Sequence, residues 1–202
     1  MCSLTRAEEI MGRNFIGRGA LSAIGGHFAV SIPDVLPDIS FDESTLVKNG
    51  CSHLLLFCPA EFSDGTKITI ETIRNKISSI GGEPCFYNQD WYLNEKFIKV
   101  SLEPKWLLLS KELLDESRAM SADKVVAKYS LHSAVELTFA FFVYFFISGG
   151  KKLWNNDYVW CSDVDDKGDQ IYVGRYTDAS GLNVDGFEIH RHLRIKKNYG
   201  VV

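Results

Sequence analysis

The stretch that decides the fold is residues 131–160, which read LHSAVELTFAFFVYFFISGGKKLWNNDYVW. Apart from Thr138, residues 137–147 are all apolar, and six of them are aromatic. A helix that is apolar on nearly every side has no face for solvent, so it belongs in the centre of a domain or in a membrane. Gly149 and Gly150 end the segment, and a tryptophan-bearing strand is expected after them.

A membrane span is the less favoured of these two interpretations. Crossing a bilayer takes roughly 20 apolar residues, and the apolar run is shorter and starts beside His132 and Glu136. A charged residue within a span costs about 2.5–3.5 kcal/mol on insertion scales. Lys151 and Lys152 would suit the flank of an anchor, so this alternative stays open. We nevertheless predict a buried helix and no membrane partner.

Length and composition indicate one ordinary globular domain. The chain has 202 residues, of which 46% are hydrophobic and 24% charged, as in soluble proteins generally. The net charge of −4 and the lack of a basic stripe argue against a nucleic-acid partner. Residues 1–15 lack the apolar region of a secretory signal. We therefore expect a cytoplasmic protein whose five cysteines are reduced.

Two parts are predicted along the chain. Residues 1–50 read as an N-terminal helical arm or linker, in which the pair Gly25-Gly26 ends a short helix at residues 21–28. Residues 51–202 read as an α+β main domain. It begins with a buried strand at residues 53–58 and the clearest amphipathic helix at residues 69–80.

Short alternating segments follow the apolar helix, for which Ser130 is a candidate N-cap. In the second of these segments Ile171 and Val173 point one way, and Tyr172 and Gly174 the other. Such spacing suggests an antiparallel meander with one face on the core. Its strands are expected at residues 158–161, 170–176, 182–187 and 193–199.

An acidic loop between the first two of these strands resembles the start of a calcium-binding loop. Asp163, Asp165 and Gly168 follow the D-x-D-x-D-G pattern, but Lys167 takes the place of the third acid. Gly174 stands where a bidentate glutamate is needed. An Asp-Gly turn is therefore favoured over a metal site.

A second candidate metal site is EIHRH, in which Glu188, His190 and His192 share one side of a continuing strand. Two histidines and a carboxylate can hold iron or zinc. Nothing near them in the sequence completes such a site, so neither a metal nor a cofactor is assigned.

Two further ionisable features have a functional and a plain interpretation. Cys58 follows a buried strand, where a nucleophile could stand, but no glycine elbow or base accompanies it, so a structural cysteine is favoured. His132 and Glu136 are four residues apart on the helix. They would be functional if buried together, but an exposed first turn is the favoured interpretation.

The two ends of the chain resemble a group of bacterial proteins, many from candidate phyla, for which no activity is assigned. One end carries the motif I-M-G-x-N-F-x-G at residues 10–17. The other carries Y-V-R-x-S-D-x-D-x-x-G at residues 158–168, from which Trp160 departs because a basic residue is usual there. The resemblance implies kinship and no particular function.

The order of elements is also similar to the C-type-lectin-like fold of formylglycine-generating-enzyme-like domains and of diversity-generating retroelement variable proteins. Those chains end in a core helix, a tryptophan-bearing strand, polar turns and a basic-apolar strand. The similarity implies a rigid scaffold that shows polar and aromatic side chains on its last strands. The ordinary wet face of a sheet is the alternative. The candidates are Trp160, Tyr172, Arg175, Tyr176, Asn183, Asp185, Glu188, His190 and His192.

These observations favour an α+β, C-type-lectin-like domain that is a non-enzymatic module for an unknown protein or small ligand. The main alternative is a metal- or thiol-dependent enzyme that uses Glu188, His190 and His192, or Cys58. A structural subunit of a phage-like assembly is a third possibility.

Overall fold

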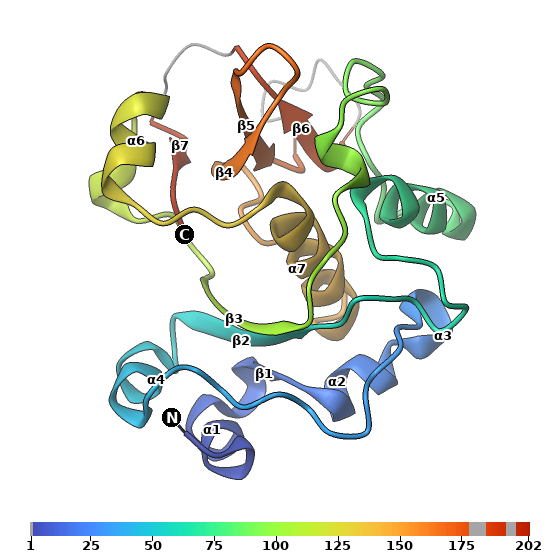
Figure 1. Ribbon diagram of the computed structural model, residues 1–202, viewed down its shortest axis with the longest axis vertical. Coiled ribbons are helices and arrows are strands. Elements are labelled where there is room, and N and C mark those ends of the chain that lie inside the picture. Colours follow the sequence, from blue (N-terminus) through green and yellow to red (C-terminus); the bar gives the residue numbers. More distant parts are fainter. Residues whose placement is uncertain (1, 178–184, 193–196) are drawn as a thin grey trace.

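The computed structural model describes residues 2–177, 185–192 and 197–202. These residues form a mixed α+β structure in which two small sheets lie on either side of one helix, α7 (Ala134–Ile147) (Figure 1). The other α-helices are α1 (Leu4–Met11), α2 (Arg18–Ala23), α3 (Gly25–Phe28), α4 (Glu43–Asn49), α5 (Ile70–Ile80) and α6 (Ala122–Lys128). The 3-10 helices are η1 (Gly12–Asn14), η2 (Phe97–Lys99) and η3 (Asp115–Ser117).

The first sheet has the strand order β1 (Phe15–Ile16), β2 (His53–Cys58), β3 (Lys105–Ser110). β1 runs parallel to β2, and β3 runs antiparallel to it with Leu55 opposite Leu108. β2 is the central strand, and every residue from Leu54 to its end is buried. A continuous apolar run is what a strand covered on both faces requires, and the predicted strand at residues 53–58 is confirmed.

The second sheet has the order β6 (Glu188–His190), β5 (Gln170–Gly174), β4 (Tyr158–Val164), β7 (Tyr199–Gly200). β4, β5 and β6 are antiparallel neighbours, as the meander requires. β7 runs parallel to β4 and so departs from it. Ile171 and Val173 belong to the main core and Tyr172 to a separate cluster, which confirms the predicted alternation.

Helix α7 begins with a capping box. The Ser133 hydroxyl accepts the N–H of Glu136 at 3.4 Å, and the Glu136 carboxylate accepts the N–H of Ser133 at 2.8 Å. The cap is therefore Ser133 and not Ser130, because only Ser133 stands three residues before a glutamate. At the other end Gly149 takes a positive φ of 70°, which lets Gly150 donate to the Phe145 carbonyl at 2.8 Å.

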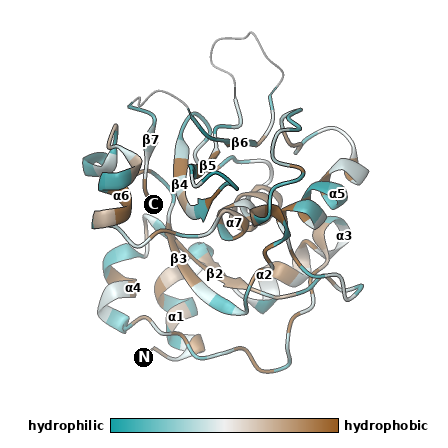
Figure 2. Cartoon of the chain, turned by 45° about the horizontal axis from the view of Figure 1, so that its top comes forward, coloured by the Kyte–Doolittle hydropathy of each residue, from teal (hydrophilic) through white to brown (hydrophobic). Residues whose placement is uncertain are grey.

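Apolar side chains converge on α7 from both sheets, and its first ten residues are all buried. Figure 2 shows hydrophobic colouring in the strands at the centre and hydrophilic turns on the peripheral helices α5 and α6. No helix in the described part of the chain combines the length and the apolar character that a membrane span needs.

The N-terminal residues pack on the body of the molecule. Strand β1 completes the first sheet, and Leu21 and Phe28 enter the main core. The ring of Phe28 lies 5.9 Å from that of Phe139 in α7. The irregular segment before α4 is also fixed, since the indole N–H of Trp106 donates to the Pro37 carbonyl at 2.9 Å.

One predicted helix differs from the structure, and two predicted strands extend beyond the described residues. The helix expected at residues 21–28 is divided, because α2 ends at Ala23 and Gly25 and Gly26 open α3 with helical backbone. Of the strand expected at residues 182–187, the described part contains the bridge between Phe187 and Phe86, and the strand that pairs with β5 is β6 at Glu188–His190. Residues 182–184 and 193–196 lie outside the described residues.

Candidate functional site

The aromatic candidates on the C-terminal strands lie in a second hydrophobic core. Trp160 and Tyr172 pack with Tyr158 and Tyr199 on the face of the second sheet that is turned away from α7. Ring centroids of Trp160 and Tyr172 are 4.8 Å apart, and those of Tyr158 and Tyr172 are 5.3 Å apart. Val125 of α6 belongs to the same cluster. We call these five residues the aromatic cluster.

Burial of the aromatic cluster changes the interpretation of the predicted site. Tyr172 is 1% exposed and Trp160 is 6% exposed, so neither is displayed to a partner. Alternating Tyr and Trp residues fit a wet face, but they equally fit a face covered by a helix, because these side chains are largely apolar. Helix α6 provides that cover.

Three polar candidates adjoin the aromatic cluster. The buried carboxylate of Glu188 accepts the hydroxyl of Tyr158, and the His190 ring stacks on Tyr172 with centroids 6.1 Å apart. The Arg175 guanidinium lies 5.9 Å from the centre of the Tyr158 ring. Burial lowers the pKa of His190 and raises that of Tyr158.

The remaining candidates lie elsewhere. Tyr176 is buried in the main core, where its ring stacks on Phe141 at 5.6 Å and its hydroxyl accepts the N–H of Cys85 at 3.1 Å. Asp185 is partly buried, and its carbonyl lies 3.4 Å from the Cys85 sulfur. His192 is exposed and pairs with another loop. Asn183 lies outside the described residues.

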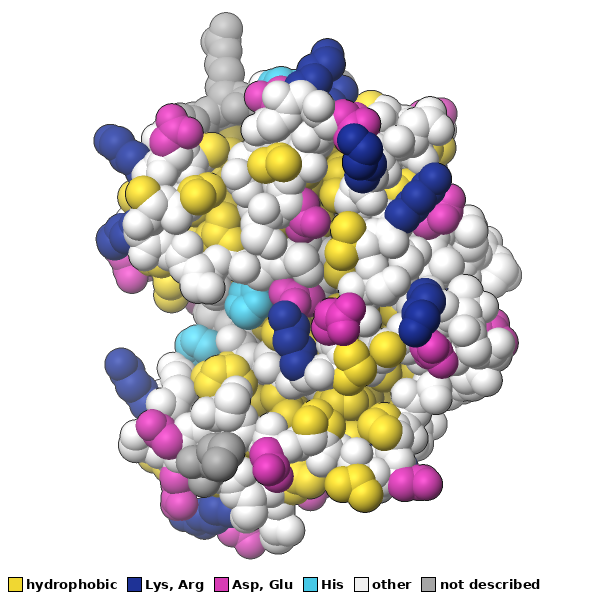
Figure 3. Space-filling view, viewed as in Figure 1, with side chains coloured by type: hydrophobic (Ala, Val, Ile, Leu, Met, Phe, Trp, Pro, Cys, Tyr) yellow, Lys and Arg dark blue, Asp and Glu magenta, His cyan; other side chains and the backbone are white. Residues whose placement is uncertain are grey.

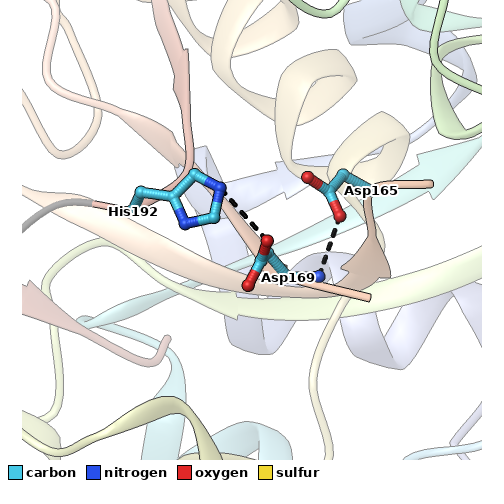
Figure 4. Close-up of side chains that lie close together, drawn as sticks. All are labelled: Asp165, Asp169 and His192. Carbon is cyan, nitrogen blue, oxygen red and sulfur yellow. Dashed lines mark hydrogen bonds and ion pairs between the residues drawn. The ribbon is translucent and has the colours of Figure 1, made fainter. Parts of the chain in front are cut away.

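The acidic loop after β4 is closed by an arginine. One oxygen of Asp165 accepts the N–H groups of Lys167 and Asp169, both at 2.8 Å, and the other pairs with the Arg191 guanidinium. His192 pairs with Asp169 at 3.1 Å (Figure 4). Asp165, Asp169 and His192 lie close enough to share a metal ion. Such an ion would have to displace Arg191, because a metal ion and a guanidinium bound to the same buried carboxylate of Asp165 would repel each other.

Asp163, the first residue of the calcium-like pattern, has a different role. Its carboxylate points at the start of α7 and accepts the N–H of Ala134 at 2.6 Å. It therefore satisfies one of the free N–H groups at that end of the helix. Burial raises its pKa.

Glu136 is buried, whereas the exposed first turn was the favoured interpretation. Its carboxylate pairs with Lys105 of β3 and lies 3.6 Å from the Nδ1 atom of His132. Although burial acts to raise its pKa, these partners and the N–H of Ser133 lower it to about 2. Cys58 nearby is fully buried, and burial raises the pKa of its thiol well above the usual range, which disfavours a nucleophile.

A cavity of about 250 Å³ lies at the far end of α7, beside the start of β1. Tyr144, Ile147 and Ser148 line it from the helix. We call it the cationic pocket, because three of its eight lining residues are basic. The lining residues are Arg13, Asn14, Ile16, Lys111, Tyr144, Ile147, Ser148 and Lys151.

Asn14 holds the wall of the cationic pocket together. Its side chain is buried and donates to the Gly50 carbonyl at 2.6 Å, while its oxygen accepts the ammonium of Lys111 at 3.3 Å. Lys111 also donates to the Cys51 carbonyl at 2.6 Å. These bonds join η1, the start of β2 and the end of β3. They keep Lys111 beside Arg13, its neighbour in the lining.

The three basic side chains have no acidic partner in the part of the chain that the structure describes. Among the described residues, no carboxylate lies within ion-pair distance of Arg13, Lys111 or Lys151, and the eight lining residues include no acid. Arg6 and Arg118, by contrast, each pair with two carboxylates. Figure 3 shows basic and acidic side chains interspersed over one face of the molecule.

Neighbouring cavities border the same residues. One of about 410 Å³ shares Arg13 and Asn14 with the cationic pocket, and another of about 500 Å³ shares Lys111. The second is lined in part by His53, whose pKa is lowered by burial and by Lys111.

Sequence reasoning missed the cationic pocket. From the sequence, the basic pair at residues 151–152 suits only the flank of a membrane anchor, and the motif at residues 10–17 has no assigned role. The signal in the sequence was that, within this motif, the basic residue Arg13 directly precedes Asn14.

Comparison with known proteins gives no relative: no family model, no curated protein and no solved structure matches this chain.

Proposed function

We propose that the protein is a non-enzymatic binding protein whose ligand is a small anion held in the cationic pocket. The observation that carries this proposal is the convergence of Arg13, Lys111 and Lys151 on one cavity without a carboxylate partner among the described residues. Three like charges gathered in this way repel one another. An anion placed among them removes that cost and gains attraction.

The size of the attraction supports the proposal. A unit charge about 4 Å from an opposite charge gains roughly 4 kcal/mol near a protein surface. The C-terminal end of α7 borders the pocket through Ile147 and Ser148, and it opposes an anion with about half a negative charge. Three full positive charges outweigh that half charge, so the site favours an anion over a cation or a neutral ligand.

The lining favours binding over catalysis. It offers the hydroxyls of Tyr144 and Ser148 and the amide of Asn14, but no histidine, cysteine or carboxylate. General acid–base catalysis near neutral pH needs a group that titrates there. The residues expected for the alternative, a metal- or thiol-dependent enzyme, are also poorly placed for catalysis. Glu188 and Cys58 are buried, and His192 pairs with Asp169.

The proposed kinship with the bacterial group gains a physical role for one of its motifs. The I-M-G-x-N-F-x-G segment supplies Arg13, Asn14 and Ile16 to the cationic pocket. Of these three residues only Asn14 stands at a fixed position of the motif, so members that keep the motif are expected to keep the hydrogen bond from Asn14 that shapes the pocket wall.

The C-type-lectin-like relationship also remains a proposal. It is supported by the order of elements, in which α7 is followed by the Trp160-bearing strand β4, an Asp-rich turn and an antiparallel partner. The display of ligand-binding side chains on the last strands is not part of the proposal, because Trp160 and Tyr172 are buried.

The test is calorimetric titration with small anions at constant ionic strength. Arg13→Gln and Lys151→Met replace two exposed basic side chains that form no hydrogen bond or ion pair with another described residue, so both variants are expected to fold. Lys124→Met, on the exposed face of α6, is the matched control. Some anion should bind the wild type with a dissociation constant of about 1 mM or tighter. Both pocket variants should weaken it, whereas the control should not.

Two results would contradict the proposal. One is that no anion in the panel binds the wild type. The other is that the pocket variants bind as tightly as the Lys124→Met control, which would place the binding elsewhere on the surface.

A further inference from the structure

We propose that the anion is a small phosphomonoester, bound as its dianion with the phosphate among Arg13, Lys111 and Lys151. This inference rests on the proposed function and names the ligand class for the same pocket. Its first support is charge. A phosphomonoester carries about −1.5 to −2 charges at neutral pH, whereas a carboxylate carries one. The dianion therefore neutralises most of the three positive charges that line the cavity.

The second support is the supply of hydrogen-bond donors. Arg13 brings a planar guanidinium with five N–H groups, which matches two oxygens of a phosphate at once. Lys151 has three N–H donors, and its ammonium group forms no hydrogen bond or ion pair with another described residue. Lys111 uses donors on Asn14 and Cys51, which leaves one of its three.

A phosphate can use all of these donors, because its three terminal oxygens are strong acceptors. A planar carboxylate has two oxygens and would leave part of this set without a partner. A phosphate therefore forms more hydrogen bonds with this set of donors than a carboxylate does.

The third support is size. Pockets for drug-sized ligands measure roughly 300–1,000 Å³, and the cationic pocket, at about 250 Å³, is smaller. Ile16, Ile147 and the ring of Tyr144 offer an apolar wall beside the basic residues. A phosphate with a few carbon atoms fits this space.

The decisive experiment compares glycerol 3-phosphate, inorganic phosphate, sulfate and acetate by titration calorimetry at constant ionic strength. Glycerol 3-phosphate should bind at least about tenfold more tightly than acetate, a difference of about 1.4 kcal/mol. Arg13→Gln and Lys151→Met should each weaken it about tenfold, and Lys124→Met should not change it.

A pH series separates phosphate chemistry from general anion binding. The second phosphate pKa lies near 6, so glycerol 3-phosphate should lose several-fold in affinity from pH 7.5 to pH 5.5. Sulfate stays a dianion over that range. The sulfate series is therefore the control for any effect of protonating His53, which lines the neighbouring cavity together with Lys111.

Each outcome has a distinct meaning. Equal affinity for acetate and glycerol 3-phosphate would overturn the phosphomonoester inference while anion binding stood. Binding of inorganic phosphate alone, with the glycerol ester excluded, would also overturn it. If no anion binds, both proposals fail. Binding of vesicles that contain phosphatidic acid, without binding of glycerol 3-phosphate, would assign the phosphate to a lipid and overturn the small-molecule inference.

Discussion

Replacement of Glu136 by Gln tests the ionic centre at the start of α7. The carboxylate is buried, pairs with Lys105 and lies 3.6 Å from the Nδ1 atom of His132. A glutamine keeps the length of the side chain and can still accept the N–H of Ser133, so the capping box survives. The substitution therefore removes the charge and little else.

The magnitude follows from the pKa of Glu136. Its lowering from 4.5 to about 2, at about 1.4 kcal/mol per pKa unit, contributes up to about 3 kcal/mol to the free energy of unfolding at pH 7. A carboxyl group whose pKa is lowered in the folded state stabilises above its unfolded pKa and loses that effect as the pH falls. At pH 3 the contribution is about 1.4 kcal/mol by the same linkage.

The assay is urea denaturation at pH 7 and pH 3, with Glu71→Gln in the exposed first turn of α5 as the control. Other carboxylates also respond to acid, so the comparison is between variants. The wild type should lose about 2 kcal/mol more than Glu136→Gln between the two pH values. An equal loss in the two proteins would refute the reasoning that Glu136 is a stabilising buried charge.

Further predictions concern the core, the cysteines and the last residue of β5. Phe142→Ala should lower the free energy of unfolding by about 3–5 kcal/mol, because the ring of Phe142 is fully buried among other rings. Phe146 is partly exposed, so Phe146→Ala should lower it by less. Equal losses for the two variants in urea denaturation would contradict the placement of Phe142 in the core. In the native protein a thiol reagent should label the exposed Cys51 and leave the buried Cys58 unreacted until denaturant is added; fast labelling of Cys58, located by mass spectrometry, would show that its strand is open. Gly174→Ala should lower the free energy of unfolding by about 2 kcal/mol or more. Gly174 has a φ of 127°, and an added Cβ atom would lie 2.6 Å from the carbonyl oxygen of Asp157. An unchanged melting temperature would refute this prediction.

Local sequence patterns predicted the parts of the fold that depend on local physics. The apolar run that forms α7 and the strand at His53–Cys58 follow directly from composition. The same patterns could not show that the alternating Tyr and Trp residues of β4 and β5 are covered, because the cover is Val125 of α6, which lies more than thirty residues earlier. Aromatic residues with a polar tip suit either environment.

Charge patterns were the least informative. Glu136 resembles an exposed residue of a first helical turn, and its burial depends on Lys105 from a strand about thirty residues earlier. The cationic pocket draws on Arg13, Lys111 and Lys151, which come from three distant parts of the chain. No window of sequence contains such a site, so only the tertiary structure could reveal it.

The position of α7 between the two sheets has a consequence for how the molecule opens. The helix contacts β2 on one side and β4 and β5 on the other, and apolar side chains from both sheets join it in one core. Neither sheet can separate from α7 without exposing that core to water. The two sheets should therefore lose their protection against hydrogen exchange together, as one cooperative unit. Fraying should begin in peripheral α6, whose Val126 is already exposed.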